Sequence, residues 1–240
     1  MKLNLSNKGL TTLDGIDLSG VTILYCSNNQ LTSLPPLTTL KELHCFNNQL
    51  TSLPPLTTLE KLYCFNNQLT SLPPLPNSLE ELDCYNNQLT SLPPLPDTLK
   101  QLYCSHNQLT SLPPLPETLK ELYCHYNQLT SLPPLPETLE KLYCYNNNNQ
   151  LTSLPPIPET LKLLYCSQTR LTSLPPLPWG LENMEVEKLS QHNKKRSDLG
   201  MKQVVTLPDN RIWDQINEMW IQWQYRIGGE KYIEVVSALK

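Results

Sequence analysis

Cysteine is the reactive residue type that this sequence places most regularly. Eight cysteines could form four disulfides, bind zinc or carry out redox chemistry. Disulfide frameworks are typical of small secreted domains, but the N-terminal residues show no apolar run typical of a signal peptide. Zinc sites favour C-x-x-C pairs, which the sequence lacks. The cysteines instead form one column with spacings of 19 to 22 residues: Cys26, Cys45, Cys64, Cys84, Cys104, Cys124, Cys144 and Cys166.

The position filled by cysteine is predicted to be a small apolar core position. Leu5 occupies it in a first coil, LNLSNKGL, and Val186 occupies it in a last half-coil, LENMEV. We therefore expect buried, reduced thiols that act as small hydrophobic side chains. Redox or metal chemistry is the alternative.

The histidines give little support for catalysis. None of His44, His106, His125 and His192 lies in a motif that pairs it with a nucleophile, a carboxylate or a second metal ligand. Cys124 precedes His125, but adjacent residues of a strand face opposite sides of a sheet, so this pair is not expected to form a dyad. The sequence predicts neither an enzyme nor a cofactor.

Composition also argues against several partner classes. The formal net charge of −4 and the absence of a large basic cluster disfavour nucleic acid. The sequence contains no run of about 18 apolar residues, so it predicts no membrane span. We expect a cytoplasmic protein, or one of the host cytoplasm if it is an injected effector or a viral protein, and no small-molecule substrate.

The elements that position these residues are repeated coils. Around each cysteine the pattern is L-x-x-L-x-C-x-x-N-x-L-T-S-L-P-P-L. The alternation in L-x-C predicts one short strand per coil, and stacked coils then form a parallel sheet with Leu and Cys in a shared core. The proline pairs predict an extended, polyproline-like return leg on the convex side, because proline disfavours helix. A role for the P-P-L-P segments as ligands of WW or SH3 domains is the less favoured alternative, since their leucines are expected in the core.

A column of asparagines follows the predicted strands. At this point the backbone turns and loses its partners in the sheet, which inward-facing amides can replace. The column comprises Asn29, Asn48, Asn67, Asn87, Asn107 and Asn127, and it ends at Thr169.

Aromatic side chains flank the cysteines on the other face of the predicted sheet, which we expect to be concave. They could only stabilise the sheet by stacking, or they could also form a binding surface for a protein partner. Nearby positions such as Glu42, Lys61 and Glu121 mix charge signs, which favours a protein over a polyanion. His106 and Tyr126 lie one position further along. The predicted partner-binding residues are Tyr63, Phe65, Tyr85, Tyr103, Tyr123, His125, Tyr143 and Tyr145.

Two segments depart from the repeat. The segment Asn146 to Asn149 lengthens one coil by two residues, as a contact point or as a tolerated insertion. After the repeats, apolar residues at helical spacing, including Trp220 and Trp223, predict an amphipathic helix that covers the last coil. Ile221, Gln222 and Arg226 weakly match a calmodulin-binding IQ pattern, so a free recruiting helix is the alternative.

The repeat region resembles the short, proline-containing leucine-rich repeats of injected bacterial effectors, and the cysteine-bearing repeats of giant viruses of amoebae. This resemblance implies a solenoid that binds a partner protein, in some cases a host protein. Some effectors carry a ubiquitin-ligase domain after the repeats. Only about 60 residues follow here and they contain no cysteine, so a cysteine-dependent ligase is not expected in this chain.

The sequence thus predicts a leucine-rich-repeat solenoid over residues 1–186, with about nine coils and a final half-coil. A polar connector would span residues 187–207 and a C-terminal helical capping segment residues 208–240. The predicted function is a non-enzymatic scaffold that binds a protein through its aromatic concave surface. The alternative is an adaptor whose C-terminal helix recruits a second protein, such as calmodulin or a ligase component.

Overall fold

The computed structural model describes residues 1–148, 150–171 and 174–185. Ten three-residue strands pair in chain order to form one parallel sheet, and no helix occurs in the described residues. Accordingly, no described segment could cross a membrane as a helix. The strands are β1 (Lys2–Asn4), β2 (Ile23–Tyr25), β3 (Glu42–His44), β4 (Lys61–Tyr63), β5 (Glu81–Asp83), β6 (Gln101–Tyr103), β7 (Glu121–Tyr123), β8 (Lys141–Tyr143), β9 (Leu163–Tyr165) and β10 (Asn183–Glu185).

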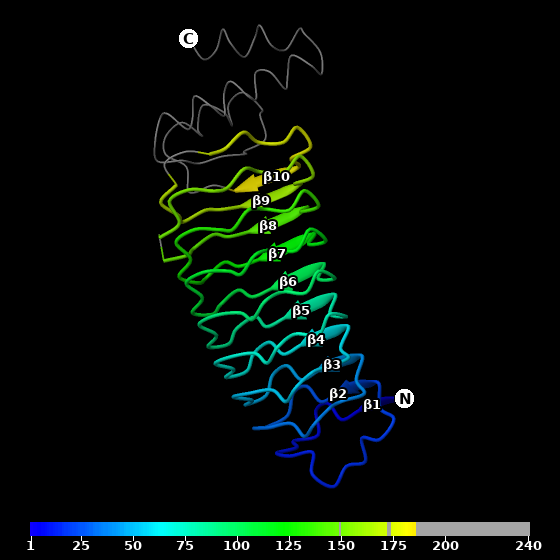
Figure 1. Ribbon diagram of the computed structural model, residues 1–240. Helices are drawn as coiled ribbons and strands as arrows, with labels where there is room; N and C mark the ends of the chain where they lie inside the picture. The colour runs from blue at the N-terminus through cyan, green and yellow to red at the C-terminus, as the bar shows by residue number, and fades with distance from the viewer. Residues whose placement is uncertain (149, 172–173, 186–240) are drawn as a thin grey trace, which may run out of the picture.

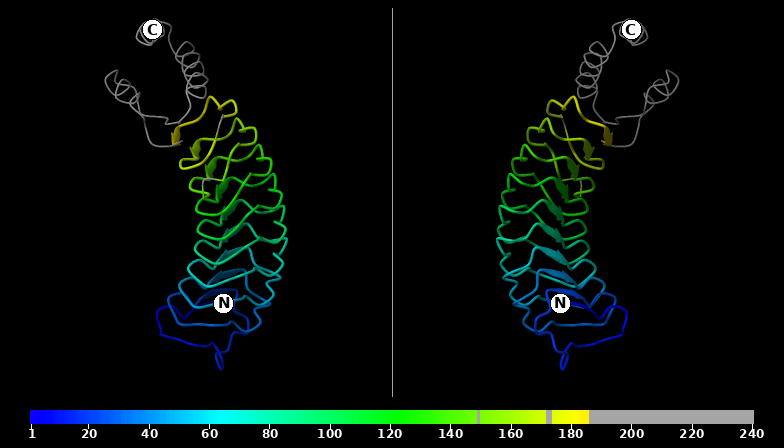
Figure 2. Two further views of the ribbon diagram at one scale, coloured as in Figure 1. Left: turned by 90° about the vertical axis from the view of Figure 1, so that its left-hand side faces the viewer. Right: turned by 90° about the vertical axis from the view of Figure 1, so that its right-hand side faces the viewer.

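The coils stack into a curved solenoid with the sheet along one side (Figures 1 and 2). We number each coil by its strand and call the sheet surface that faces away from the core the strand face. This is the surface predicted to be concave. The predicted connector (187–207), the predicted capping segment (208–240) and Val186 lie outside the described residues.

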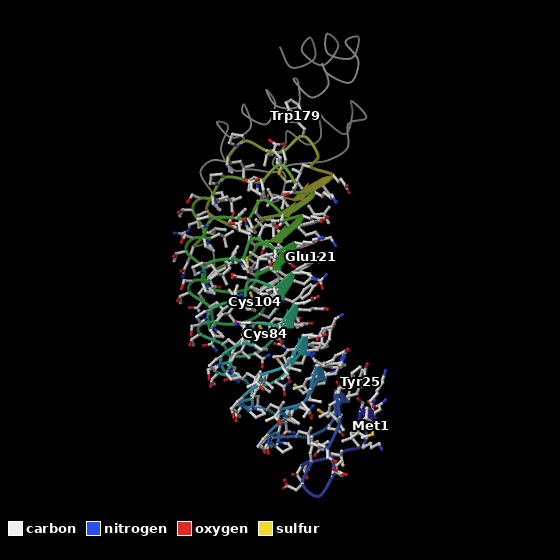
Figure 3. The ribbon with its side chains drawn as sticks, turned by 45° about the vertical axis from the view of Figure 1, so that its right-hand side comes forward. Met1, Tyr25, Cys84, Cys104, Glu121 and Trp179 are labelled. Carbon is white, nitrogen blue, oxygen red and sulfur yellow. The ribbon has the colours of Figure 1, made fainter. Side chains whose placement is uncertain are left out.

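The core is a column of leucines and cysteines that repeats in every coil. The central leucine of each strand from β2 to β9 is fully buried, and so is the cysteine two residues later. Leu5 takes the cysteine position in coil 1 and is also buried, as predicted. Figure 3 shows Cys84 and Cys104 on the inner side of the sheet, and Tyr25 and Glu121 on the outer side.

The described return legs contain no helix, in line with their proline pairs, but their core residues change with coil length. In the 19-residue coils, Leu37 and Leu56 are buried. In the 20-residue coils an extra proline such as Pro76 takes the buried place, and the preceding leucine, Leu75, is only partly buried. The leucines of the P-P-L-P segments are therefore less central to the core than expected.

The asparagine column is confirmed as an internal hydrogen-bond ladder. Asn107 is representative: its Nδ2 donates to the carbonyl oxygens of Cys84 (3.0 Å) and Cys104 (3.2 Å), and its Oδ1 accepts from the Leu89 N–H (3.0 Å). Each amide thus joins two adjacent coils at the point where the strands end. Asn147 extends the ladder into coil 8, with Nδ2 2.8 Å from the Cys144 carbonyl oxygen.

The inserted residues of coil 8 follow this ladder position rather than interrupt it. Gln150 N–H donates to the Asn147 carbonyl oxygen at 2.9 Å, whereas the equivalent Gln128 N–H donates to Leu109 of the previous coil. Asn148 has a positive φ of 47°, and residue 149 lies outside the described residues. The insertion therefore replaces one bond between coils by a local turn.

A second ladder at the opposite end of the strands was not predicted. One hydroxyl side chain per coil donates to a carbonyl oxygen of the preceding coil at 2.7 to 2.9 Å. Both ends of each strand from β3 to β8 are therefore tied to the neighbouring coil by side chains. The donors are Thr39, Thr58, Ser78, Thr98, Thr118, Thr138 and Thr160.

Replacing Asn107 with Ala is expected to destabilise the solenoid strongly. The change leaves the Leu89 N–H without its partner. It also removes one of the two amide donors to each of the Cys84 and Cys104 carbonyl oxygens, so the total cost should be about 2 to 4 kcal/mol. Urea unfolding measures this cost. The adjacent Gln108→Ala serves as control because its side chain is exposed. Equal unfolding midpoints for the two variants would contradict the role of the ladder.

All eight thiols are expected to resist alkylation in the folded protein. The cysteines are free and buried, and burial raises the pKa of Cys104 and of Cys144 to about 12. Because the thiolate is the reacting form, iodoacetamide at pH 8 should label few sites before denaturation and eight afterwards. Intact-protein mass spectrometry counts the labels. Fast labelling of the native protein, or a mass that indicates disulfides, would show that the thiols are not buried as described.

Candidate functional site

Side chains on the strand face fall into three columns that run across the coils. The pre-cysteine column holds the residue directly before each cysteine, and the post-cysteine column holds the residue directly after it. The turn column holds the next residue, which lies between the strand and the asparagine ladder. Because the sheet is in strict register, equivalent residues of adjacent coils lie side by side, as the pairing of Tyr103 with Tyr123 shows.

The pre-cysteine column forms two stacks of rings. Tyr25, His44 and Tyr63 stack with centroid separations of 4.3 and 4.4 Å. The second stack has separations of 4.7, 4.3 and 4.5 Å, and contains Tyr103, Tyr123, Tyr143 and Tyr165. Asp83 occupies the coil between the two stacks.

The post-cysteine column contains two shorter stacks. Phe46 and Phe65 are 4.3 Å apart, and His125 and Tyr145 are also 4.3 Å apart. The predicted site residues therefore divide between two columns of one surface. The structure places Tyr63, Tyr103, Tyr123 and Tyr143 in the pre-cysteine column and Phe65, Tyr85, His125 and Tyr145 in the post-cysteine column.

The turn column adds two rings that the predicted site omitted. His106 and Tyr126 stack at 4.2 Å, and His106 also meets the edge of Tyr85 at 5.0 Å. In coils 2 to 5 asparagine fills this column, and its amides form an exposed chain, with Asn86 donating to Asn66 at 2.8 Å. The signal in the sequence was the replacement of asparagine by a ring at just these two repeats.

Backbone geometry makes those two rings unusual. Every turn-column residue from coil 1 to coil 9 has a positive φ, and His106 and Tyr126 have values of 53° and 52°. Asparagine tolerates this left-handed region better than a bulky aromatic residue does. Tyr126 is also 41 % exposed, the highest value for any ring of the strand face. Strained, exposed residues of this kind tend to lie at functional positions.

Hydrogen bonds and ion pairs fix the orientation of the pre-cysteine tyrosines. The Tyr103 hydroxyl donates to Glu121 Oε2 at 3.0 Å, and Lys141 Nζ lies 3.0 Å from Glu121 Oε1. Burial and, after it, the negative charge of Glu121 hold the pKa of Tyr103 well above its usual range. The phenol is therefore a neutral hydrogen-bond donor at physiological pH.

A serine–histidine contact also occurs, although sequence reasoning paired no histidine with a nucleophile. Ser105 Oγ lies 2.9 Å from His125 Nδ1, a contact between adjacent coils that no local motif reveals. Ser105 is only 1 % exposed, and burial lowers the pKa of His125 to about 4. A buried hydroxyl beside such a weak base is poorly suited to attack a substrate. The contact instead holds the His125 ring against Tyr145.

Asp83 is the one carboxylate with a ring on both sides in the pre-cysteine column of the described coils. Its Oδ1 accepts a hydrogen bond from the Tyr85 N–H at 3.2 Å. The side chain is half-buried, and its strand neighbours are Tyr63 and Tyr103. Burial raises the pKa of Asp83 to about 6, because the charged form is poorly solvated there. The charge of this aspartate therefore destabilises the fold at neutral pH.

Replacing Asp83 with Asn is expected to stabilise the protein above pH 6. The folded-state pKa of about 6 exceeds the usual 3.8, so the stability of the wild type falls as the pH rises between these values. The gain should be about 1 to 3 kcal/mol at pH 7.5 and much smaller at pH 4. Urea midpoints at both pH values measure it, with exposed Asp97→Asn as control. An equal gain at both pH values would contradict the burial of the charge.

Known protein families were compared with the chain, and the match lies in the repeat region. The sequence profile described as Leucine Rich repeats (2 copies) matches five overlapping segments: 38–77, 57–97, 77–117, 97–136 and 117–159. Together they span just over half of the chain, residues 38–159 of 240. No curated protein sequence matches the chain significantly.

Two solved structures of bacterial proteins are similar to the solenoid. YopM from Yersinia enterocolitica WA-314 is 34 % identical with a TM-score of 0.60, over 71 % of this chain and 43 % of that one. YopM from Yersinia pestis, described as a leucine-rich effector protein, is 29 % identical with a TM-score of 0.61, over 78 % and 72 %. The match thus spans less than half of the first YopM chain. The repeat profile and these two structures show that the chain belongs to the leucine-rich repeat family.

Proposed function

We propose that the protein is an interaction scaffold whose strand face binds a partner protein. Leucine-rich repeat proteins are typically scaffolds for protein–protein interaction, and the similar YopM structures come from bacterial effectors. The observation that carries the proposal is the aromatic surface of coils 4 to 8, whose rings contact one another from Tyr85 in coil 5 to Tyr145 in coil 8. A host protein is the partner that similarity to effectors favours, and the cytoplasm of the host is then the place where the two meet.

The aromatic surface has the properties of a protein-binding surface. Tyrosine supplies a large contact area with few rotatable bonds, which keeps the entropic cost of binding low. Here the rings are already held by stacking and, at Tyr103, by a hydrogen bond to Glu121. Their orientation should therefore change little when a partner docks, which favours affinity.

The charges around the rings favour a protein over a polyanion. Glu81 pairs with Lys61 at 3.4 Å and Glu121 pairs with Lys141 at 3.0 Å, so the positive charges of the strand face are largely matched within the sheet. A nucleic acid would need an excess of unpaired Lys and Arg. A protein partner with its own mixed charges meets no such requirement.

A variant with both Tyr103→Ala and Tyr123→Ala is expected to remain folded and to lose most partner binding. Both rings project from the sheet rather than into the core, and an aromatic hot spot typically contributes about 2 kcal/mol, or roughly thirtyfold in affinity. Quantitative capture from host-cell lysate, followed by titration with the purified partner, measures the loss. Circular dichroism confirms the fold.

The matched control carries Glu117→Ala and Glu137→Ala, two exposed positions on the return legs. This variant should bind the partner as the wild type does. If binding survives the loss of both tyrosines but is lost when the Asn146 to Asn149 segment is changed, the docking site lies at the insertion and the strand face is only a stacked support.

A further inference from the structure

We propose that coil 5 is a receptor site for an arginine side chain of the partner protein. The Asp83 carboxylate is its anion, and the rings of Tyr63 and Tyr103 are its walls. This inference rests on the proposed function, because it assumes that a protein docks on the strand face. It specifies which chemical group that protein must present.

The first observation is an interruption in an otherwise continuous column of rings. In the pre-cysteine column, aromatic rings occupy coils 2 to 4 and coils 6 to 9, and Asp83 alone replaces a ring between them. Tyr63 pairs with Asp83 in the sheet register, and Asp83 pairs with Tyr103. Within the described coils, no ring contact joins Tyr63 to Tyr103.

The spacing of the column determines what fits at the interruption. Stacked rings of adjacent coils are 4.3 to 4.7 Å apart, close to the strand spacing of a sheet. Tyr63 and Tyr103 are separated by two strand spacings, or roughly 9 to 10 Å. One planar group placed between them would contact each ring at an ordinary stacking distance. A tyrosine fills that position in the adjacent coils.

The second observation is a carboxylate without a cation. Asp83 takes part in none of the ion pairs found among the described residues, and its hydrogen bond comes from a neutral backbone N–H. The nearest carboxylate along β5, Glu81, already pairs with Lys61. The unfavourable burial seen in the raised pKa of Asp83 is what an incoming cation would relieve. Because the side chain is half-buried, a partner's side chain can still reach it.

Arginine meets these requirements better than lysine does. Its guanidinium is planar, so it can stack between two rings, and it can bind a carboxylate through two parallel N–H groups. It is also more weakly hydrated than an ammonium group, which lowers the cost of entering a half-buried position. The column already accepts a cation at its N-terminal end, where Lys2 Nζ lies 4.5 Å from the centre of the Tyr25 ring.

The test uses the full chain and a minimal probe, N-acetylarginine N-methylamide, at pH 7.5 and fixed ionic strength. NMR of protein with labelled Asp carboxyl carbons and Tyr rings follows the titration. Saturable shifts are expected at Asp83, Tyr63 and Tyr103. Two analogues serve as controls. The lysine analogue keeps the positive charge but has no planar group, and the citrulline analogue keeps a planar group but is uncharged. Arginine should bind at least fivefold more tightly than either.

Two variants make the result decisive. Asp83→Asn keeps the shape and removes the charge, and Asp83→Tyr completes the ring column with the residue of the adjacent coils. Both should weaken binding of the arginine probe at least tenfold while leaving the protein folded. Equal binding of the citrulline probe, or unchanged binding to either variant, would overturn the proposal. If no probe binds at Asp83 but the Tyr103→Ala, Tyr123→Ala variant still loses its partner, only the arginine site falls and the docking face stands.

Discussion

The structure depends on hydrogen bonds that satisfy the backbone where each three-residue strand ends. So short a strand makes few bonds within the sheet, and the carbonyl oxygens that follow it turn towards a core that excludes water. The Asn107 amide meets two such oxygens and one N–H, and its equivalents do the same from coil to coil. An unsatisfied buried polar group costs about 1 to 3 kcal/mol. Alternative registers are therefore excluded throughout the stack.

Strict register gives the strand face its character. Because coils 2 to 8 end their strands at the same amide, equivalent outward side chains lie one strand spacing apart, and rings in adjacent coils can stack, as Tyr123 and Tyr143 do. Single substitutions then become visible as local departures from a column. Asp83 breaks a ring column, whereas His106 and Tyr126 convert an asparagine column into a ring stack. The repeat provides the support, and these departures distinguish one part of its surface from another.

The sequence predicted most of what repeats along the coils and missed contacts between particular residues of adjacent coils. Leucine and cysteine alternation predicted the strands, and Leu5 showed that the cysteine position is buried, since both follow from local periodicity. The contact of Ser105 with His125 joins residues 20 apart and requires the exact register. The hydroxyl ladder that begins at Thr39 was missed because threonine before a leucine has no distinctive local pattern. The candidate rings were predicted, but their division into stacks around Asp83 was not.

Stacking and binding need not be competing explanations of the aromatic surface. A ring that stacks on its neighbours stabilises the sheet and also loses its freedom before any partner arrives. His125 shows the connection, because a buried serine and the Tyr145 ring both hold its imidazole in place. At Asp83 the fixed rings have a different consequence. They hold a space of fixed width around a carboxylate that forms no ion pair with the described residues. Under the proposal above, such a preordered surface should bind most tightly to a partner side chain that supplies both a planar group and a positive charge at this position.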